Sequence, residues 1–210
     1  MNRMENAAQQ NTTLMRYNRI ASWYDFMESP IERWCLTEWR SRLKERIIGE
    51  KALEAGVGTG KNLPYYPPQV EVLAIDFSSR MLSRARKKAK QNNLKVEFLE
   101  MDLQQLAFPD HFFDTVFATF VFCSVPDPVL GLKELRRVCK PGGRLLLLEH
   151  MRPGNPSLGL LFDLLNPLAV RIMGANINRR TVANIKLAGW QLKINQKLSS
   201  DIVRWIEATP

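Results

Sequence analysis

The sequence has few residues that could hold a disulfide framework or a structural metal. Among its 210 residues are three cysteines, Cys35, Cys123 and Cys139, which form no CxxC pair and whose odd number excludes a fully paired set. The chain has only two histidines, which also disfavours a structural zinc site. We therefore expect a protein that is kept reduced inside the cell and that binds no metal.

The sequence also lacks a long, uninterrupted apolar run. Residues 1–14 are too polar for the apolar core of a signal peptide. The most apolar stretch, 158–174, is interrupted by Asp163, Pro167 and Arg171, so it does not have the 18 or more apolar residues of a membrane span. We expect a cytoplasmic protein that does not cross a membrane.

Basic residues outnumber acidic ones: 30 Lys and Arg stand against 21 Asp and Glu, a formal net charge of +9 at pH 7. Such an excess suits an anionic partner, either nucleic acid or acidic lipid headgroups, although a role in solubility alone is an equally simple interpretation. The hydrophobic fraction of 45% is enough to form one full core. We expect residues 1–48 to form a helical, membrane-facing N-terminal cap and residues 49–210 to form one domain.

From residue 51 onward, strand patterns alternate with helix patterns. Short apolar segments predict strands at 51–56, 70–76, 95–101, 112–122 and 144–150. Helices are expected over 78–91 and 127–139, and a helical insert at about 151–188 precedes two last strands at 190–198 and 202–208. Strands that alternate with helices of this length form parallel sheets covered on both faces. The predicted fold class is therefore α/β, with a doubly wound, mostly parallel seven-stranded sheet and an N-terminal helical cap.

A glycine-rich turn follows the first predicted strand. Gly56, Gly58 and Gly60 permit a tight turn and let backbone N–H groups approach a ligand closely. A dinucleotide fingerprint would have a third glycine at position 61, where this chain has Lys61, which disfavours NAD. Asp76 ends the second strand about 20 residues later, where a carboxylate can accept hydrogen bonds from both ribose hydroxyls.

Two more carboxylates accompany this turn. Asp102 ends the third strand, where it could accept a hydrogen bond from an adenine amino group. Glu54 lies inside the first strand, where an unpaired charge would be unfavourable unless a cationic ligand group or an amide network compensated it. Three carboxylates around one glycine turn favour a nucleoside that carries a positive charge over a polyphosphate.

The same stretches resemble a known family. The segments LEAGVGTGKN (53–62), AIDFSSRML (74–82), EMDLQQLAFPDHFFD (100–114) and LKELRRVCKPGGRLLLLEH (132–150) are similar, in this order, to the motifs of class I S-adenosylmethionine-dependent methyltransferases. FPDHFFD and RVCKPGGRLLLLE are most similar to the branch that contains ubiquinone/menaquinone C-methyltransferases and bacterial phospholipid N-methyltransferases. The resemblance covers residues 16–150 well and 151–210 more loosely. It implies a Rossmann-like methyltransferase fold and S-adenosylmethionine as cofactor, with S-adenosylhomocysteine as product.

The resemblance also implies a role for individual residues. Gly56, Gly58 and Gly60 would wrap the methionine portion of the cofactor, and Glu54 would organise its amino group. Asp76 would hold the ribose, and Asp102 and Leu103 would contact the adenine edge. The remaining cofactor-binding residues implied are Tyr17, Tyr24, Asn62, Phe77, Met81 and Thr119, of which Phe77 and Met81 would line the adenine face.

Two residues are candidates for the chemistry on the acceptor side. Tyr17 and Tyr24 lie in YNRIASWYD (17–25), which resembles a segment that closes over the cofactor in this branch, although Asn18 replaces its first aspartate. Tyr24 would therefore contact cofactor and acceptor together, unless both tyrosines belong to the core. His150, at the end of the fifth strand, could accept a proton from the acceptor or could be structural.

The acceptor is expected to be lipid-like. The last 60 residues carry eight basic residues against three acidic ones, and the apolar segment 156–174 is typical of an interfacial or pocket-lining helix. This insert resembles that of bacterial phosphatidylethanolamine methyltransferases, whereas 175–190 and 120–128 resemble membrane-associated thiol methyltransferases from animals. The phospholipid amine is therefore favoured over a lipophilic thiol or a quinone carbon, and a non-catalytic cofactor-binding protein is the alternative of a different class. TFVFCSVPDP (119–128) lacks an NPPY-type motif, so no nucleic acid partner is expected.

Overall fold

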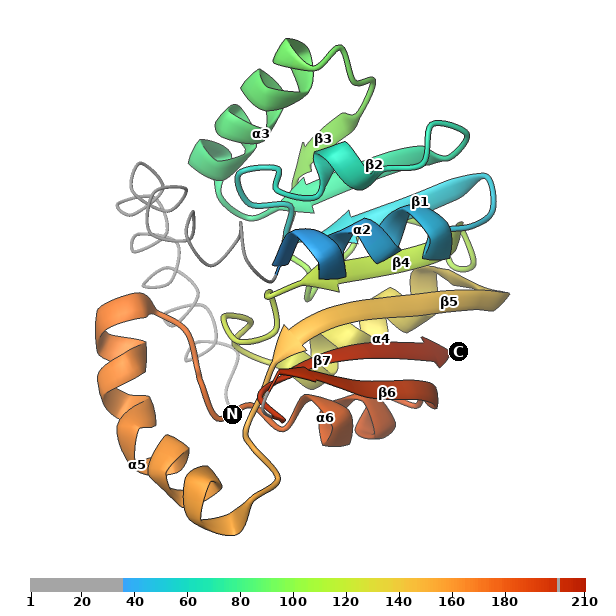
Figure 1. Ribbon diagram of the computed structural model, residues 1–210. Coiled ribbons are helices and arrows are strands. Elements are labelled where there is room, and N and C mark those ends of the chain that lie inside the picture. Colours follow the sequence, from blue (N-terminus) through green and yellow to red (C-terminus); the bar gives the residue numbers. More distant parts are fainter. Residues whose placement is uncertain (1–35, 200) are drawn as a thin grey trace.

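The computed structural model describes residues 36–199 and 201–210, which form one seven-stranded sheet with helices on both faces (Figure 1). The strands are β1 (Lys51–Ala55), β2 (Glu71–Asp76), β3 (Glu97–Glu100), β4 (Phe113–Thr119), β5 (Cys139–His150), β6 (Gln191–Ser199) and β7 (Val203–Thr209). They lie in the order β3-β2-β1-β4-β5-β7-β6. Neighbours from β3 to β5 are parallel, and β7 is antiparallel to both β5 and β6. The predicted α/β fold with a mostly parallel sheet is confirmed.

The helices are α2 (Thr37–Arg46), α3 (Ser79–Gln91), α4 (Pro128–Val138), α5 (Pro156–Met173) and α6 (Thr181–Leu187), with a short 3₁₀ helix η2 (Leu63–Tyr65). The helices α2 and α4 lie on opposite faces of the sheet, whereas α5 projects beyond the carboxyl end of β5 (Figure 1). On one face, Leu43 of α2 packs with Phe117 and Trp205, and on the other face Leu132 and Leu135 of α4 enter the larger core. Of the predicted N-terminal cap, α2 is the helix that lies within the described residues.

Side-chain caps start two of these helices at the predicted places. The Ser78 hydroxyl accepts a hydrogen bond from the backbone N–H of Met81 at the start of α3, and Asp127 accepts one from Leu130 at the start of α4. Such caps satisfy N–H groups that have no partner inside the helix, so a polar residue before an apolar periodic segment is a reliable start signal.

The largest difference from the predicted element boundaries is at the start of β5, whereas β3 and β4 are shorter than predicted by two to four residues. The sequence predicts that the PGG segment at 141–143 turns the chain into the fifth strand, but β5 already begins at Cys139, which pairs with Phe113 of β4. The register then shifts so that Thr115 pairs with Arg144, and the residues between bulge out of the ladder. The PGG segment is therefore a bulge inside one long strand, and the prediction of a turn before the strand was wrong.

The topology fixes where a ligand can bind. Strand order reverses between β1 and β4, because β1 is followed in space by β2 on one side and by β4 on the other. In open sheets of this kind, ligands bind outside the carboxyl ends of the strands at that reversal. The helix α5 leaves the sheet from the carboxyl end of β5, at the same edge (Figure 1). No helix within the described ranges is both long and apolar enough to cross a membrane.

Candidate functional site

A pocket opens at the carboxyl ends of β1, β2 and β4. The predicted site residues that line it are Gly56, Gly58, Asn62, Asp76, Phe77, Met81, Asp102, Leu103 and Thr119. Glu54 is buried next to Asn62, and Gly60 ends the turn behind the lining residues. Tyr17 and Tyr24 lie outside the described residues.

The glycine turn after β1 has a conformation that other residues rarely adopt. Gly56 has a φ of +70°, and a Cβ there would lie 2.6 Å from a methyl group of Val121. Gly58 has a φ of +56°, and a Cβ there would meet no protein atom within 4 Å, in the part of the pocket that this glycine lines. The two glycines thus permit the turn and leave the space above it for a ligand.

Asp76, at the end of β2, is hydrogen-bonded both to the glycine turn and to the segment that leads into α3. Its Oδ2 accepts a hydrogen bond from the Gly58 N–H at 2.9 Å, and its Oδ1 accepts one from the Ser78 N–H at 2.9 Å. Burial raises the pKa of Asp76 to about 6, although the backbone N–H donors act in the opposite direction. Each carboxylate oxygen can accept a second hydrogen bond, so ligand hydroxyls could bind to the same group.

Glu54 is held by an amide network, one of the two explanations that its sequence position left open. Its Oε1 accepts a hydrogen bond from the Asn62 side chain at 2.5 Å, and its Oε2 accepts one from the Tyr66 hydroxyl. Burial raises the pKa of Glu54 to about 8, whereas the Asn62 hydrogen bond and the positive charge of Arg40 lower it. Glu54 is therefore mostly protonated at pH 7 until a cation approaches it.

Arg40 is a site residue that the sequence reasoning missed. Only 3% of its surface is exposed, it lines the pocket, and its Nη1 donates to Asn62 Oδ1 at 2.6 Å and to Thr119 Oγ1 at 2.7 Å. A signal existed, because Leu36, Arg40, Leu43 and Ile47 share one helical face and the other three are buried apolar residues. This end of the pocket therefore has a buried arginine, which could face the carboxylate of an amino acid, and beside it a buried carboxyl group, which could face the ammonium group.

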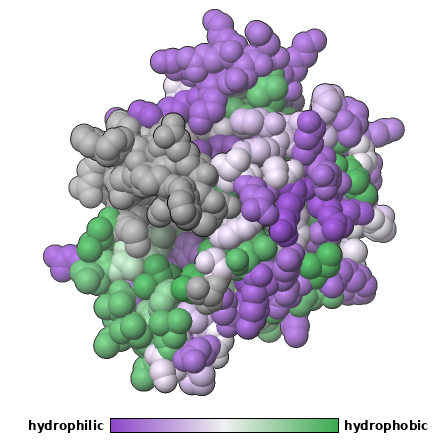
Figure 2. Space-filling view, in the orientation of Figure 1, coloured by the Kyte–Doolittle hydropathy of each residue, from purple (hydrophilic) through white to green (hydrophobic). Residues whose placement is uncertain are grey.

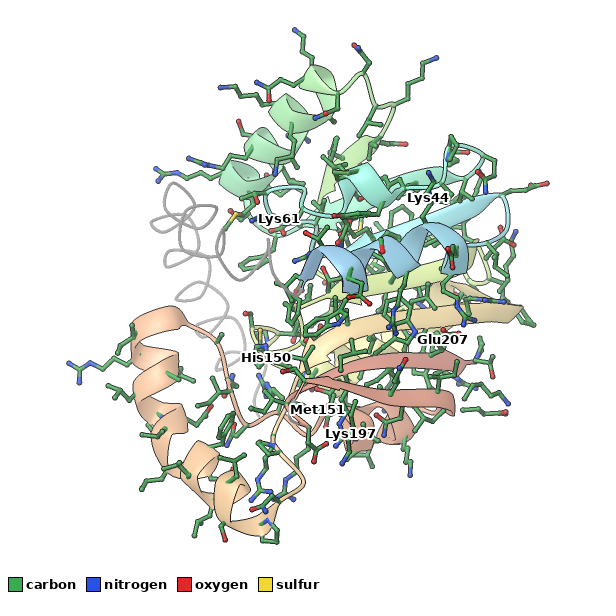
Figure 3. The ribbon with its side chains drawn as sticks, in the orientation of Figure 1. Lys44, Lys61, His150, Met151, Lys197 and Glu207 are labelled. Carbon is green, nitrogen blue, oxygen red and sulfur yellow. The ribbon has the colours of Figure 1, made fainter. Side chains whose placement is uncertain are left out.

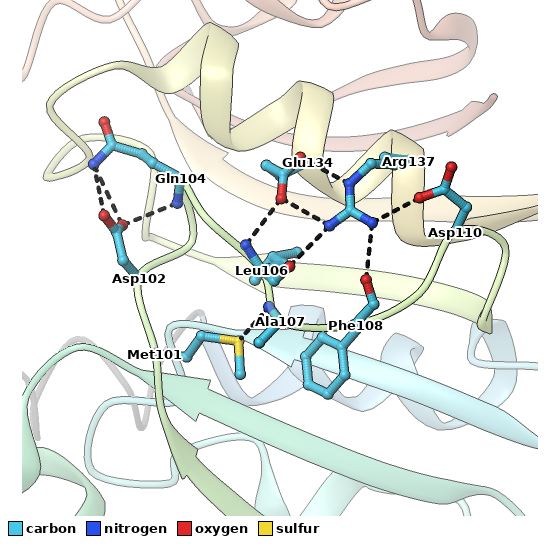
Figure 4. Close-up of polar contacts among 9 residues, drawn as sticks. All are labelled: Met101, Asp102, Gln104, Leu106, Ala107, Phe108, Asp110, Glu134 and Arg137. Atoms are coloured by element: carbon cyan, nitrogen blue, oxygen red, sulfur yellow. Dashed lines mark hydrogen bonds and ion pairs between the residues drawn. The ribbon is translucent and has the colours of Figure 1, made fainter. Parts of the chain in front are cut away.

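A second network holds the segment that follows β3 (Figure 4). Asp102 accepts a hydrogen bond from the backbone N–H of Gln104 at 2.9 Å. Further along, the guanidinium of Arg137 on α4 donates to the carbonyl oxygens of Leu106 and Phe108, at 2.9 and 2.8 Å. The pocket wall that contains Asp102 is thus fixed locally, and the segment that follows it is held by α4.

His150 lies at the carboxyl end of β5, next to the pocket wall but not among the residues that line it (Figure 3). Its ring stacks on Phe120, with centroids 6.2 Å apart, and the guanidinium of Arg40 lies 5.6 Å from the centroid of the same Phe120 ring. Burial lowers the pKa of His150, while a hydrogen bond with the Asn176 backbone raises it, so the imidazole is neutral at pH 7. The Phe120 ring therefore contacts both the His150 imidazole and the Arg40 guanidinium. Its φ of +56° is unusual for an aromatic residue.

Comparisons with known proteins identify the family. A family model described as a methyltransferase domain matches residues 53–147. The chain is 37% identical over 153 residues to a demethylmenaquinone methyltransferase of Thermus thermophilus, a match that covers 70% of this chain and 69% of that protein. The chain belongs to the class I S-adenosylmethionine-dependent methyltransferases.

Within this methyltransferase family, two further similarities bear on the acceptor and the fold. The chain is 45% identical over 104 residues to a phosphatidylethanolamine N-methyltransferase of Cereibacter sphaeroides, a match that covers 49% of this chain and about half (51%) of that protein. A structure of a methyltransferase from Thermotoga maritima superimposes with a TM-score of 0.68 at 21% identity, over 93% of this chain and 98% of that one. At this identity the structural match supports the fold alone.

The pocket fits the cofactor of this family, which joins a nucleoside to an amino acid through a positively charged sulfur. The space above Gly58 would be filled by any side chain, Asp76 can still accept hydrogen bonds from hydroxyls, and Glu54 and Arg40 lie together at the other end. A polyphosphate would place negative charges beside the Asp76 carboxylate and would oppose the ionisation of Glu54, so it fits poorly.

Proposed function

We propose that the protein transfers a methyl group from S-adenosylmethionine to a lipid-like acceptor, most favourably the amine of phosphatidylethanolamine, at an anionic membrane surface. The observation that carries this proposal is the outward face of α5, the helix that leaves the sheet at the edge where the pocket opens. The similarity to the Cereibacter sphaeroides enzyme supports the same class of acceptor.

In α5 the apolar side chains face outward and polar side chains face the protein, which is the reverse of an ordinary surface helix. Its exposed large hydrophobic residues are Leu160 (67%), Leu161 (47%), Leu164 (76%), Leu165 (43%), Leu168 (56%) and Ile172 (64%). Its polar residues Asp163 and Asn166 point instead toward the body of the protein, where both are hydrogen-bonded. Figure 2 shows hydrophobic side chains gathered over the region of α5. A helix of this kind is favoured where its outer face meets apolar lipid chains rather than water.

The charge of the chain supports a lipid surface as the partner. The outward face of α5 carries no acidic residue, and its one basic residue, Arg171, lies in the last turn. With a net charge of +9 for the whole chain, acidic headgroups would attract this protein over distances of about 10 Å, and the attraction would weaken as salt is added.

Within the pocket, the residues take the roles that their positions favour. Asp76 would accept the ribose hydroxyls, and Phe77 and Met81 would contact the adenine face. Asp102 and Leu103 would meet the adenine edge. At the amino-acid end, Glu54 and Asn62 would face the ammonium group, and Arg40 and Thr119 would lie near the carboxylate.

When bound, the cofactor supplies a methyl group on a sulfonium as the electrophile. The protein's task is then to align the acceptor with that methyl group and to exclude water. An amine must lose a proton to complete the transfer, and we propose that the neutral His150 imidazole accepts it, since its lowered pKa leaves a lone pair available at pH 7. Tyr24 stays a prediction for the wall that the acceptor contacts.

The decisive experiment is incubation of the protein with methyl-labelled S-adenosylmethionine and total bacterial lipid, followed by separation of the products. Labelled monomethyl or dimethyl phosphatidylethanolamine is the expected result. A labelled quinone would favour the activity of the Thermus thermophilus relative instead, and a labelled thiol would favour the third class of acceptor. No labelled product, with cofactor binding intact, would mean a protein that binds the cofactor without catalysis.

Membrane binding is tested with a matched pair of variants. Leu164→Glu places a charge on the α5 face, whereas Leu187→Glu places one at a similarly exposed leucine (69%) on α6. We expect the wild type and L187E to sediment with anionic vesicles more than with zwitterionic ones, less so at high salt, and L164E to stay in the supernatant. Equal sedimentation of both variants would refute the assignment of α5.

A further inference from the structure

The segment that follows β4 forms one wall of the cofactor pocket, and β5 holds its first part. Val121, Ser124 and Val125 line the pocket. The Glu149 side chain accepts hydrogen bonds at Oε1 from the backbone N–H groups of Val121, at 2.8 Å, and Phe122, at 3.2 Å. The conformation of this wall therefore depends on side chains that come from outside the segment.

The second part of this wall is held by the loop that follows α5. The backbone N–H and the side-chain Nδ2 of Asn176 both donate to the carbonyl oxygen of Cys123, at 2.8 and 3.0 Å. Arg179, from the same loop, donates from Nη2 to the carbonyl oxygen of Val125 at 2.7 Å. The carbonyl groups of Cys123 and Val125, both in this wall, are thus hydrogen-bonded to one loop.

The same loop is tied to α5 itself. The Asn166 side chain of α5 accepts a hydrogen bond from the Ile177 N–H at 2.9 Å and donates one to Asn176 Oδ1 at 3.2 Å. One turn earlier on the helix, Asp163 accepts a hydrogen bond from Asn178 at 3.0 Å. Asn176 is therefore the residue that contacts both α5 and the pocket wall through its side chain.

We infer that Asn176 is a positioning residue that couples the seating of α5 on a lipid surface to the shape of the pocket wall formed by residues 121–125. This inference rests on the proposed membrane contact of α5. When the outer face of α5 is fixed by lipid, Asn166 fixes Asn176, and Asn176 in turn fixes the carbonyl of Cys123. The wall is then ordered where the acceptor arrives, so methyl transfer is favoured when the enzyme is on its lipid and not when it is free.

The alternative is that Asn176 only stabilises the fold, and a residue from the same loop separates the two. Asn178 contacts Asp163 on α5, but no hydrogen bond among the described residues joins its side chain to the pocket wall. Asn178→Ala is therefore a matched control for Asn176→Ala. Each removes one asparagine side chain from the loop, and only Asn176→Ala removes a side chain that joins α5 to the carbonyl oxygen of Cys123, while the backbone hydrogen bond to Cys123 remains.

The experiment measures hydrogen–deuterium exchange of residues 121–125 in the full chain, with and without anionic vesicles, beside vesicle sedimentation and S-adenosylhomocysteine affinity. In the wild type and in N178A, we expect vesicles to slow exchange in this segment at least about fivefold. In N176A, which keeps the backbone hydrogen bond to Cys123 but loses both side-chain contacts, we expect less than about twofold slowing, while sedimentation and cofactor affinity stay within about twofold of wild type. Should N176A fold poorly, Asn166→Ala breaks the same connection on the α5 side and is expected to give the same loss.

The outcomes separate this inference from the proposed function. If N176A or N166A retains the vesicle-induced slowing, the coupling is refuted while the membrane contact stands. If the wild type sediments with vesicles and shows no slowing, the coupling is again refuted. If the wild type does not sediment at all, the membrane contact fails and the coupling fails with it.

Discussion

The buried carboxyl group of Glu54 predicts that cofactor binding depends on pH in a specific way. Burial raises the pKa of Glu54 to about 8, so the free protein holds this group mostly protonated at pH 7. The α-ammonium of S-adenosylmethionine, placed beside Glu54, would favour the carboxylate and expel the proton. Binding should therefore release a proton, and affinity should rise as the pH rises toward 8.

The size of the effect follows from the pKa. A group that must lose its proton with a pKa of about 8 strengthens the apparent affinity about ninefold between pH 6 and 7. Asp76, whose pKa is about 6, adds about twofold over the same interval if it must also be ionised. In Glu54→Gln the first contribution disappears and the second remains, so the affinity should change only about twofold. The α-ammonium itself stays protonated below pH 7 and does not disturb the comparison.

Calorimetric titration with S-adenosylhomocysteine at pH 6 and 7, in buffers of different ionisation enthalpy, measures both the affinity and the protons released. Glu149→Gln is the matched control, since it neutralises another fully buried carboxyl group, whose hydrogen bonds are to the backbone N–H groups of Val121 and Phe122 and not to Asn62 or Tyr66. We expect this control to retain the wild-type pH dependence. A wild type whose affinity is flat between pH 6 and 7, or an E54Q variant with the full wild-type slope, would refute the assignment of Glu54 to the ammonium group.

Four further predictions test the site. Asp76→Ala should weaken S-adenosylmethionine binding by about 1.5–3 kcal/mol, because buried ribose hydroxyls lose a charged acceptor, and unchanged affinity in a folded variant, by calorimetry, contradicts the assignment. Arg40→Met should weaken binding of S-adenosylmethionine at least about tenfold but leave the affinity for the decarboxylated compound unchanged in the same titration, unless Arg40 does not face the carboxylate. His150→Ala should lower turnover about 10- to 1000-fold and remove the rising limb of the pH–rate profile, and a limb that persists assigns the proton to another acceptor. Burial raises the pKa of Glu149 from 4.5 to about 7, so the folded state keeps a proton that the unfolded state loses, and this stability is present below pH 4.5 and lost as the pH rises through 7. Thermal unfolding of Glu149→Gln should therefore show a gain over wild type that grows from pH 5 to 8, up to about 3 kcal/mol, and a constant difference would be evidence against the raised pKa.

Much of the fold could be predicted because its signals are local. Ser78 and Asp127 mark helix starts through their own side chains, and the apolar runs of the central strands reveal their burial directly. The bulge after Cys139 could not be predicted, because it depends on how β5 pairs with β4, whereas proline and glycine in a sequence indicate a turn and a bulge equally well.

Most of the predicted residues that line the pocket lie at or just after strand ends, whereas residues that reach the pocket or its wall from more distant elements were missed. The glycine turn, Asp76 and Asp102 follow strands whose carboxyl ends meet, so topology alone brings them together. Arg40 enters the pocket from α2, and Asn176 contacts the segment after β4 from a loop more than 50 residues away in sequence. Such contacts depend on how a helix or an insert packs on the sheet, which residue type and spacing do not determine.

Both the pocket and the outer face of α5 hold groups in energetically unfavourable surroundings in the free protein, and a bound partner would stabilise them. Glu54 and Asp76 are carboxyl groups whose pKa values burial raises, which means that the free protein holds them in surroundings that disfavour their charge. A cationic, hydroxyl-bearing ligand compensates both groups at once, so affinity arises from the same desolvation that destabilises the free protein. The leucines of α5 follow the same logic, since their exposure to water is unfavourable and the proposed lipid contact would remove it. Ligand and lipid should therefore each raise the unfolding temperature, and ligand at about 100 times its Kd should contribute about 2.7 kcal/mol.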